Sequence, residues 1–173
     1  MDLLEGLLKN ILITAVACIF PMAVGITAYV VGNKVPWVYK IARFVGAFFE
    51  SCSPFFVIIL VFYSGGFLFS KPLVGREASV IIGLTICLMG YMPARYEAKN
   101  SLTKNLAVNT VGLVSTAFKW SSVACIVSVT ELFRVVQNYV AYGTIVPLII
   151  AAAIMGVILL ALELTKAFLN HKL

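Results

Sequence analysis

The chain has 173 residues, of which 62% are hydrophobic and 12% are charged. Soluble domains contain roughly 45–50% apolar and about 25% charged residues, so this composition excludes an ordinary soluble domain and a disordered chain. A net charge of +6, with 13 basic and 7 acidic residues, is typical of a membrane protein with basic cytoplasmic loops. The sequence contains no run of Lys or Arg that would indicate nucleic-acid binding. We expect a single domain, residues 1–173, that folds within a lipid bilayer.

Five segments approach the length of a transmembrane helix, about 20 mainly apolar residues. The first covers 7–31; it is preceded by acidic residues and is too long for a signal-peptide core, so we predict a retained span. The second covers 54–69, with Ser53 as a candidate N-cap and Pro54 at the first helical position. The third covers 78–96 and is expected to kink at Pro93.

The fourth segment, 106–130, differs because polar residues and Lys119 interrupt its apolar positions. We expect it to be buried among other helices or to line a polar cavity, and whether it crosses fully or re-enters stays open. The fifth segment, 145–164, is the clearest span. Its Ala152 and Gly156 have the spacing that permits close helix packing.

Two further stretches are polar or mixed. Residues 34–50 repeat large apolar side chains at helical spacing between basic ones, which predicts an amphipathic helix in the membrane interface. Gln137 and Asn138 are typical of a solvated polar turn between the last two spans.

The basic residues predict how the chain is oriented, because Lys and Arg concentrate in cytoplasmic connections. With the N-terminus outside, the cytoplasmic segments hold more of them than the remainder of the chain. We therefore predict an N-out, C-in bundle. The residues assigned to the cytoplasm are Lys34, Lys40, Arg43, Arg95, Lys99, Lys104, Lys166 and Lys172, and the others are Lys9, Lys71, Arg76, Lys119 and Arg134.

The sequence offers no enzyme or metal site. The single histidine, His171, excludes a His-based triad and a multi-histidine metal centre, and no glycine-rich phosphate-binding loop is present. The four cysteines lack metal-binding spacing and are expected to be small buried residues: Cys18, Cys52, Cys87 and Cys125. We expect no catalysis, no cofactor and no metal.

Lys119 is the most informative charge. Within a bilayer, a charge at mid-span costs at least about 2.5–3.5 kcal/mol unless it meets water or a partner, which predicts a water-filled path or a buried ion pair. The alternative is that Lys119 snorkels to an interface beside Trp120. Because Ser121 and Ser122 follow directly, we take Lys119, Ser121 and Ser122 as candidate residues of a substrate path.

Three stretches of the chain resemble permease subunits of polar amino-acid ABC importers. The best match is 113–133, in which residues 118–123, Phe-Lys-Trp-Ser-Ser-Val, resemble the family's Leu-Lys-Asp-Thr-Ser-Leu and residues 128–133 resemble Gly-Val-Pro-Glu-Leu-Leu. Residues 48–57 are similar to the family's Phe-Arg-Gly-Thr-Pro-Leu phrase, with Glu50 where Arg is usual, and 90–98 resemble the end of the third span.

The resemblance implies a type I importer fold and a set of partners. It implies a second permease subunit, a pair of ATP-binding subunits inside and an extracytoplasmic solute-binding protein outside. It also implies a bacterial cytoplasmic membrane and the inward movement of a small polar solute, an amino acid, by alternating access. ATP would then be hydrolysed by the separate subunits.

One departure from the family concerns the cytoplasmic loop that docks on the ATP-binding subunits. Only about 99–105 is available between the third and fourth apolar segments, so most of that coupling loop is absent. Arg95, Glu97 and Lys99 remain as weak candidates for the ATPase contact. The shortening leaves open a second interpretation, a non-transporting or regulatory membrane scaffold derived from such a permease.

Overall fold

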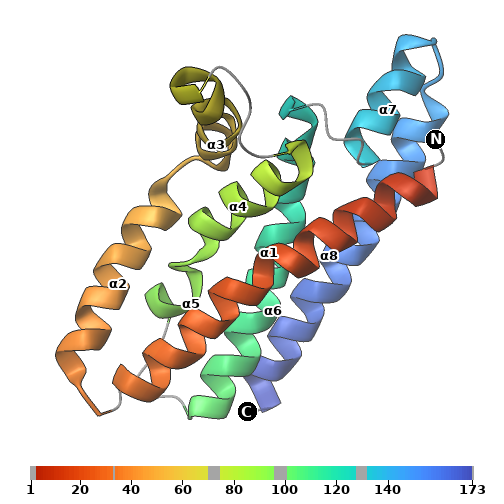
Figure 1. The fold of residues 1–173 in the computed structure, drawn as a ribbon. Helices are drawn as coiled ribbons and strands as arrows, with labels where there is room; N and C mark the ends of the chain where they lie inside the picture. Colours follow the sequence, from red (N-terminus) through yellow and green to blue (C-terminus); the bar gives the residue numbers. More distant parts are fainter. Residues whose placement is uncertain (1–2, 33, 70–74, 96–100, 128–131, 173) are drawn as a thin grey trace.

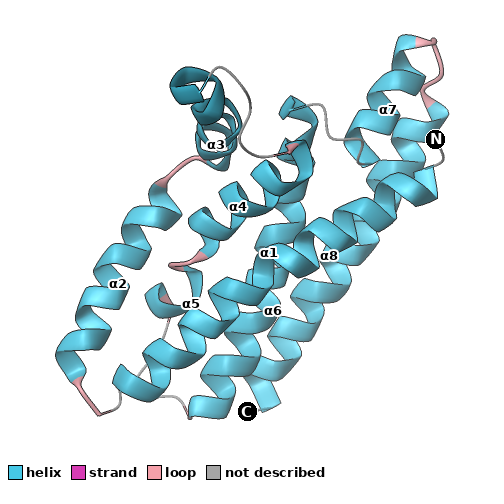
Figure 2. Ribbon diagram, in the orientation of Figure 1, coloured by secondary structure: helices cyan, strands magenta, loops and turns pink. Residues whose placement is uncertain are grey.

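The computed structural model describes residues 3–32, 34–69, 75–95, 101–127 and 132–172 (Figure 1). Within these ranges the chain is almost entirely helical, short loops join the helices and no strand occurs (Figure 2), which confirms the predicted all-α class. The elements in chain order are α1 (Leu3–Gly32), α2 (Pro36–Ser51), α3 (Pro54–Phe69), α4 (Arg76–Leu88), α5 (Tyr91–Ala94), α6 (Leu102–Ser121), the 3₁₀ helix η1 (Ser122–Val127), α7 (Leu132–Ala141) and α8 (Val146–Lys172).

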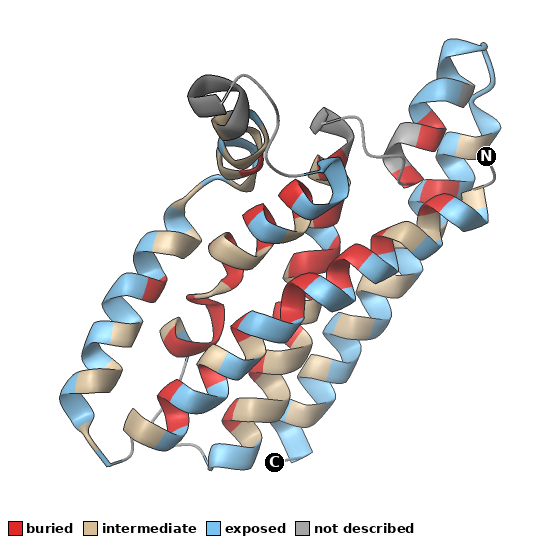
Figure 3. Ribbon diagram, in the orientation of Figure 1, coloured by how far each residue is buried: buried red, intermediate tan, exposed pale blue. Residues whose placement is uncertain are grey.

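The core lies where α1, α4 and α6 meet, and the buried residues gather on these helices (Figure 3). Ala17 of α1, Leu84 of α4 and Leu113 of α6 are fully buried there. The outer surfaces of α2 and α8 are instead largely exposed and apolar, with Phe44 79% and Val157 67% exposed. Soluble monomers rarely expose so much apolar surface, so these faces fit a lipid bilayer or another subunit.

Length and composition mark three described helical segments as able to cross a membrane: α1, the α4–α5 segment Arg76–Ala94, and α8. The pair formed by α2 and α3 makes a fourth if it counts as one span, although an 84° bend separates its halves. The predicted segments 7–31 and 54–69 correspond to α1 and α3. Helix α6 is not among the segments marked as able to cross a membrane, because polar residues interrupt its apolar positions.

The third predicted segment, 78–96, is broken rather than kinked at Pro93. Helix α4 ends at Leu88, and after Met89 and Gly90 the short α5 begins. Pro93 explains the position of the break, because a proline has no N–H to donate to the carbonyl four residues earlier, here that of Met89. The effect of the proline therefore appears one turn before it.

The fourth predicted segment, 106–130, is a central helix with a changed end. Helix α6 begins earlier, at Leu102, because the Ser101 side chain caps it by accepting a hydrogen bond from the Lys104 N–H at 3.1 Å. It contacts α1, α4, α5 and α8, and its buried face includes Asn105, Asn109 and Ser115. The expectation of burial among other helices is thus confirmed. After Ser121 the chain continues as η1, and residues 128–131 lie outside the described residues.

The C-terminal part contains one more helix than the sequence predicted. Gln137 and Asn138 lie on α7, so the predicted polar turn is wrong at these residues; the turn comes later, where Gly143 has a φ of +80°. Helix α8 extends the predicted 145–164 segment to Lys172. Ala152 and Gly156 are exposed, and no other part of the described chain approaches a side chain added at Gly156 within 4 Å.

Candidate functional site

The C-terminal end of α5 presents backbone carbonyls inside the bundle, and side chains from three other helices bind them. The Tyr29 hydroxyl of α1 donates to the Met92 carbonyl at 2.6 Å, and the Tyr39 hydroxyl of α2 donates to the Pro93 carbonyl at 2.9 Å. Asn109 of α6 donates to the Tyr29 oxygen at 3.0 Å and to the Arg95 carbonyl at 3.4 Å. Irregular backbone at membrane depth needs such internal partners, because lipid offers none.

Two glycines let α2 pack directly on the break between α4 and α5. A side chain added at Gly90 would overlap the backbone of Gly46, and one added at Gly46 would lie 2.7 Å from the Gly90 Cα. The two backbones are therefore in direct contact. Close approach of this kind is a common way for membrane helices to associate, since it maximises van der Waals contact and brings polar groups within bonding distance.

Arg95, a predicted ATPase contact, has its partners within the chain. Its guanidinium forms an ion pair with Glu50 at the end of α2 and lies 3.8 Å from the centre of the Tyr91 ring. Glu97 and Lys99, the other two predicted ATPase contacts, lie outside the described residues.

Lys119 is paired with Glu163 of α8, at an Nζ–Oε1 distance of 3.4 Å. The same carboxylate oxygen accepts a hydrogen bond from Ser115 at 3.0 Å, and Lys166 lies 3.9 Å from the other oxygen. The pair is only half-buried, with Lys119 48% and Glu163 47% exposed. A partnered lysine was one of the two environments expected for Lys119, although the pair is less buried than predicted.

Ser121 and Ser122 do not converge with Lys119 on one site. Ser121 is fully buried, and its hydroxyl donates to the Phe118 carbonyl one turn earlier at 2.8 Å. Ser122 begins η1 and lines a cavity toward α1, α7 and α8. The three candidates therefore occupy three environments: an ion pair with α8, a local backbone hydrogen bond and a cavity wall.

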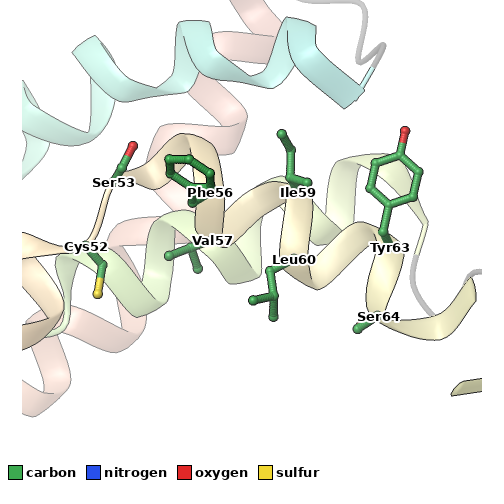
Figure 4. Close-up of a pocket in the computed structure, with 8 residues that line it drawn as sticks. All are labelled: Cys52, Ser53, Phe56, Val57, Ile59, Leu60, Tyr63 and Ser64. Atoms are coloured by element: carbon green, nitrogen blue, oxygen red, sulfur yellow. The ribbon is translucent and has the colours of Figure 1, made fainter. Parts of the chain in front are cut away.

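An open apolar groove of about 600 Å³ runs along α3. Figure 4 shows that Phe56, Ile59 and Tyr63 extend from one side of the helix and Val57, Leu60 and Ser64 from the other. The remaining lining residues are Cys52 and Ser53 at the bend that precedes α3. Because no charged side chain lines this groove, it suits lipid chains or an apolar subunit surface better than a polar solute.

Several of these residues were missed from sequence. Tyr29 and Asn109 lie in apolar surroundings with no motif around them, and no sequence pattern signalled that they would bind the carbonyls at the end of α5. The spacing of Glu163 from Lys119 carried no signal in the sequence, because the two residues lie on different helices. Of the cysteines, Cys18 and Cys87 are buried as predicted, whereas Cys52 is only partly buried.

Comparisons with known proteins give one informative likeness. A chain in the crystal structure of an amino acid ABC transporter with histidines is similar over 99% of this chain and 94% of its own length, with a TM-score of 0.76 and 16% sequence identity. No family model and no curated protein sequence matches the chain. At this identity the likeness is one of fold: the chain shares the helical fold of this amino acid ABC transporter chain, which agrees with the fold that the sequence resemblance implied.

Proposed function

We propose that this chain is the transmembrane permease subunit of an ABC importer that carries a small polar solute, an amino acid, into the cell. The observation that carries the proposal is the likeness of fold to an amino acid ABC transporter over the full length of the chain. The apolar helices α1 and α8, which are long enough to span a bilayer, agree with a membrane role. The stretches 48–57, 90–98 and 113–133 add the sequence resemblance.

The assembly follows from this role. We place the chain in a bacterial cytoplasmic membrane, N-terminus out and C-terminus in, beside a second permease subunit that is either another copy or a relative. The exposed apolar faces of α3 and α8 offer surface for that subunit and for lipid. ATP-binding subunits would bind on the inner side, and an extracytoplasmic protein would deliver the solute on the outer side.

The transport path remains a proposal based on Lys119, Ser121 and Ser122. In an alternating-access cycle, Lys119 would attract the carboxylate of an amino acid in exchange for Glu163, and Ser122 would supply a neutral hydrogen bond. The Lys119–Glu163 pair is open enough for this exchange, because each side chain is about half-exposed. An ion pair in this position keeps the Lys119 charge compensated between transport cycles.

The test is co-expression with the ATP-binding and permease reading frames that neighbour this one. Recovery of stoichiometric ATP-binding subunits, with hydrolysis stimulated by solute and its binding protein in nanodiscs, would support the importer. A Lys→Ala change in the phosphate-binding loop of the ATP-binding subunit is the control, since it must abolish hydrolysis. Solute-independent hydrolysis, or no hydrolysis at all, would argue against the importer.

One observation favours a second candidate, a scaffold or regulatory subunit that does not transport. Only residues 95–101 lie between α5 and α6, where the family carries its coupling loop, and Arg95 is already paired with Glu50. Stable purification of the chain with a second permease but without ATP-binding subunits would favour this candidate.

A further inference from the structure

We propose that the outer face of α2 binds an anionic phospholipid, with the phosphate held by Lys40 and Arg43 and the acyl chains lying along the apolar residues beside them. The site rests on the membrane placement in the proposed function and adds no step to transport. Helix α2 begins at the end of the bundle where α1 ends and the C-terminus lies (Figure 1). In the proposed orientation this end faces the cytoplasm.

The side of α2 that turns away from the bundle carries a stripe of large apolar side chains. Its members recur at intervals of four, three and four residues, which places them on one side of a helix. Each member is more than half exposed: Trp37, Ile41, Phe44 and Phe48. The opposite side of α2 packs on the bundle through Tyr39 and Gly46. The stripe is therefore open to the acyl chains of a lipid.

Two basic residues flank this stripe on one side. Lys40 directly precedes Ile41 of the stripe, and Arg43 directly precedes Phe44. Because Lys40 and Arg43 are three residues apart, their side chains are neighbours on the helix surface. Both are exposed, and the exposed Lys34 in the turn before α2 adds a third positive charge at the same end. The helix thus presents a row of cations beside an apolar surface.

The cations of this row differ from the other basic residues at this end of the bundle. Among the described residues, Lys34, Lys40 and Arg43 have no acidic, hydrogen-bonding or aromatic partner. The single acidic residue of α2, Glu50, is paired with Arg95. The basic residues of α6 and α8 at this end all have partners: Lys104 with the Asn170 carbonyl at 2.7 Å, Lys166 with Glu163, and Lys172 with the Phe168 ring.

An anionic phospholipid matches both parts of this surface. A phosphate accepts two parallel hydrogen bonds from a guanidinium and pairs with an ammonium as a point charge. Phe44 and Phe48 follow the two cations along the helix, so acyl chains that extend from a phosphate held there would cover these rings. A zwitterionic lipid adds its own positive charge beside Lys40 and Arg43, which they repel. A free phosphate leaves the apolar stripe uncovered.

Quenching of tryptophan fluorescence by brominated lipids tests the site, because Trp37 lies within one turn of Lys40. The full chain is placed in phosphatidylcholine nanodiscs in which brominated phosphatidylglycerol or brominated phosphatidylcholine replaces the same small fraction of lipid. The Trp37 signal is the difference between the wild type and a Trp37→Phe variant, which removes the contribution of Trp120. We expect phosphatidylglycerol to be enriched at Trp37 by at least about fivefold over its share of the bilayer.

Two double variants separate this site from the general charge of the surface. Lys40→Gln, Arg43→Gln keeps polar side chains but removes both charges, so the enrichment at Trp37 should disappear. Lys166→Gln, Lys172→Gln removes the same net charge from α8 and is the matched control, which should keep the enrichment. A Lys40→Arg, Arg43→Lys variant conserves the charge and should keep it as well.

Three outcomes would overturn the lipid site. They are an equal loss of enrichment in the two Gln double variants, no enrichment in the wild type, and no quenching of Trp37 by either brominated lipid. The measurement needs no other subunit and no transport. Absence of enrichment therefore overturns the lipid site alone, whereas absence of solute-stimulated hydrolysis counts against the importer alone.

Discussion

The hydroxyl of Tyr29 lies 2.6 Å from the carbonyl oxygen of Met92 and accepts a hydrogen bond from Asn109 at 3.0 Å. One oxygen thereby joins α1, α5 and α6 at the C-terminal end of α5. Both of its bonds are buried, and the Met92 carbonyl that it binds also accepts the Arg95 backbone N–H at 3.2 Å. The stability of the broken segment should depend on this contact.

Tyr29→Phe keeps the ring but removes both hydrogen bonds. Because it leaves the Met92 carbonyl and the Asn109 amide without this partner in the interior, we expect a loss of about 1–3 kcal/mol in the free energy of unfolding. Unfolding in mixed micelles by denaturant, followed by circular dichroism, measures the change. Tyr142→Phe is the matched control, because Tyr142 is 86% exposed. Equal stability of the two variants would contradict the role of Tyr29.

Gly90→Ala tests the backbone contact between α2 and the break. Replacing glycine by alanine ordinarily stabilises a compatible site by about 0.4–1 kcal/mol through the unfolded chain. Here the added methyl group meets the backbone of Gly46, which cannot rotate away as a side chain could, so overpacking of about 1–3 kcal/mol should prevail. Gly156→Ala, in open space, should be neutral or stabilising. A Gly90→Ala variant as stable as Gly156→Ala would refute the contact.

The Glu50–Arg95 ion pair can be measured by a double-mutant cycle. Glu50 is 25% and Arg95 41% exposed, so the pair is shielded enough for a coupling energy of about 1 kcal/mol or more between Glu50→Gln and Arg95→Gln. The exposed pair Lys9–Glu77, at 3.3 Å, is the control and should couple by less than about 1 kcal/mol. If the two cycles gave equal energies, Arg95 would be free to bind another subunit, as the sequence resemblance implied.

The parts of the fold that the sequence predicted are those set by local composition. Helix α3 begins at Pro54, the predicted first helical position, and α1 ends at Gly32, one residue beyond the predicted segment 7–31. The 3₁₀ end of α6 was not predicted, because a uniform helix and a tightened last turn have the same composition. Helix α7 was not predicted, because Gln137 and Asn138, which are exposed on it, are also typical of a polar turn.

The site was harder to predict because its contacts join distant segments. The polarity of 106–130 correctly indicated a helix buried among others. For Lys119 the sequence left open a water-filled path, a buried ion pair or snorkelling; the residue lies in the last turn of α6, half-exposed, and pairs with Glu163. Which partner it would have depended on the packing of α6 against α8, which no spacing within one helix encodes. For the same reason the lack of a partner for Lys40 and Arg43 among the described residues is visible only in the folded chain.

The role of Lys119 in transport can be separated from its role in the ion pair. Lys119→Met should reduce solute uptake to background while insertion and helical content persist, because Glu163 retains Ser115 and Lys166 as partners. Lys166→Met removes another positive charge beside the same carboxylate and is the matched control, so its uptake should stay near the wild-type rate. Uptake is measured in proteoliposomes that contain the complete transporter.

The double variant Lys119→Met, Glu163→Met then decides between the two roles. It replaces both members of the Lys119–Glu163 pair with apolar side chains, which is often neutral for stability, and leaves Lys166, 36% exposed, without that carboxylate. If Lys119 binds the solute carboxylate, uptake should stay at background in the double variant, because no cation replaces it. Recovered uptake would mean that Lys119 serves only to neutralise Glu163, and the proposed path through Lys119 would be wrong.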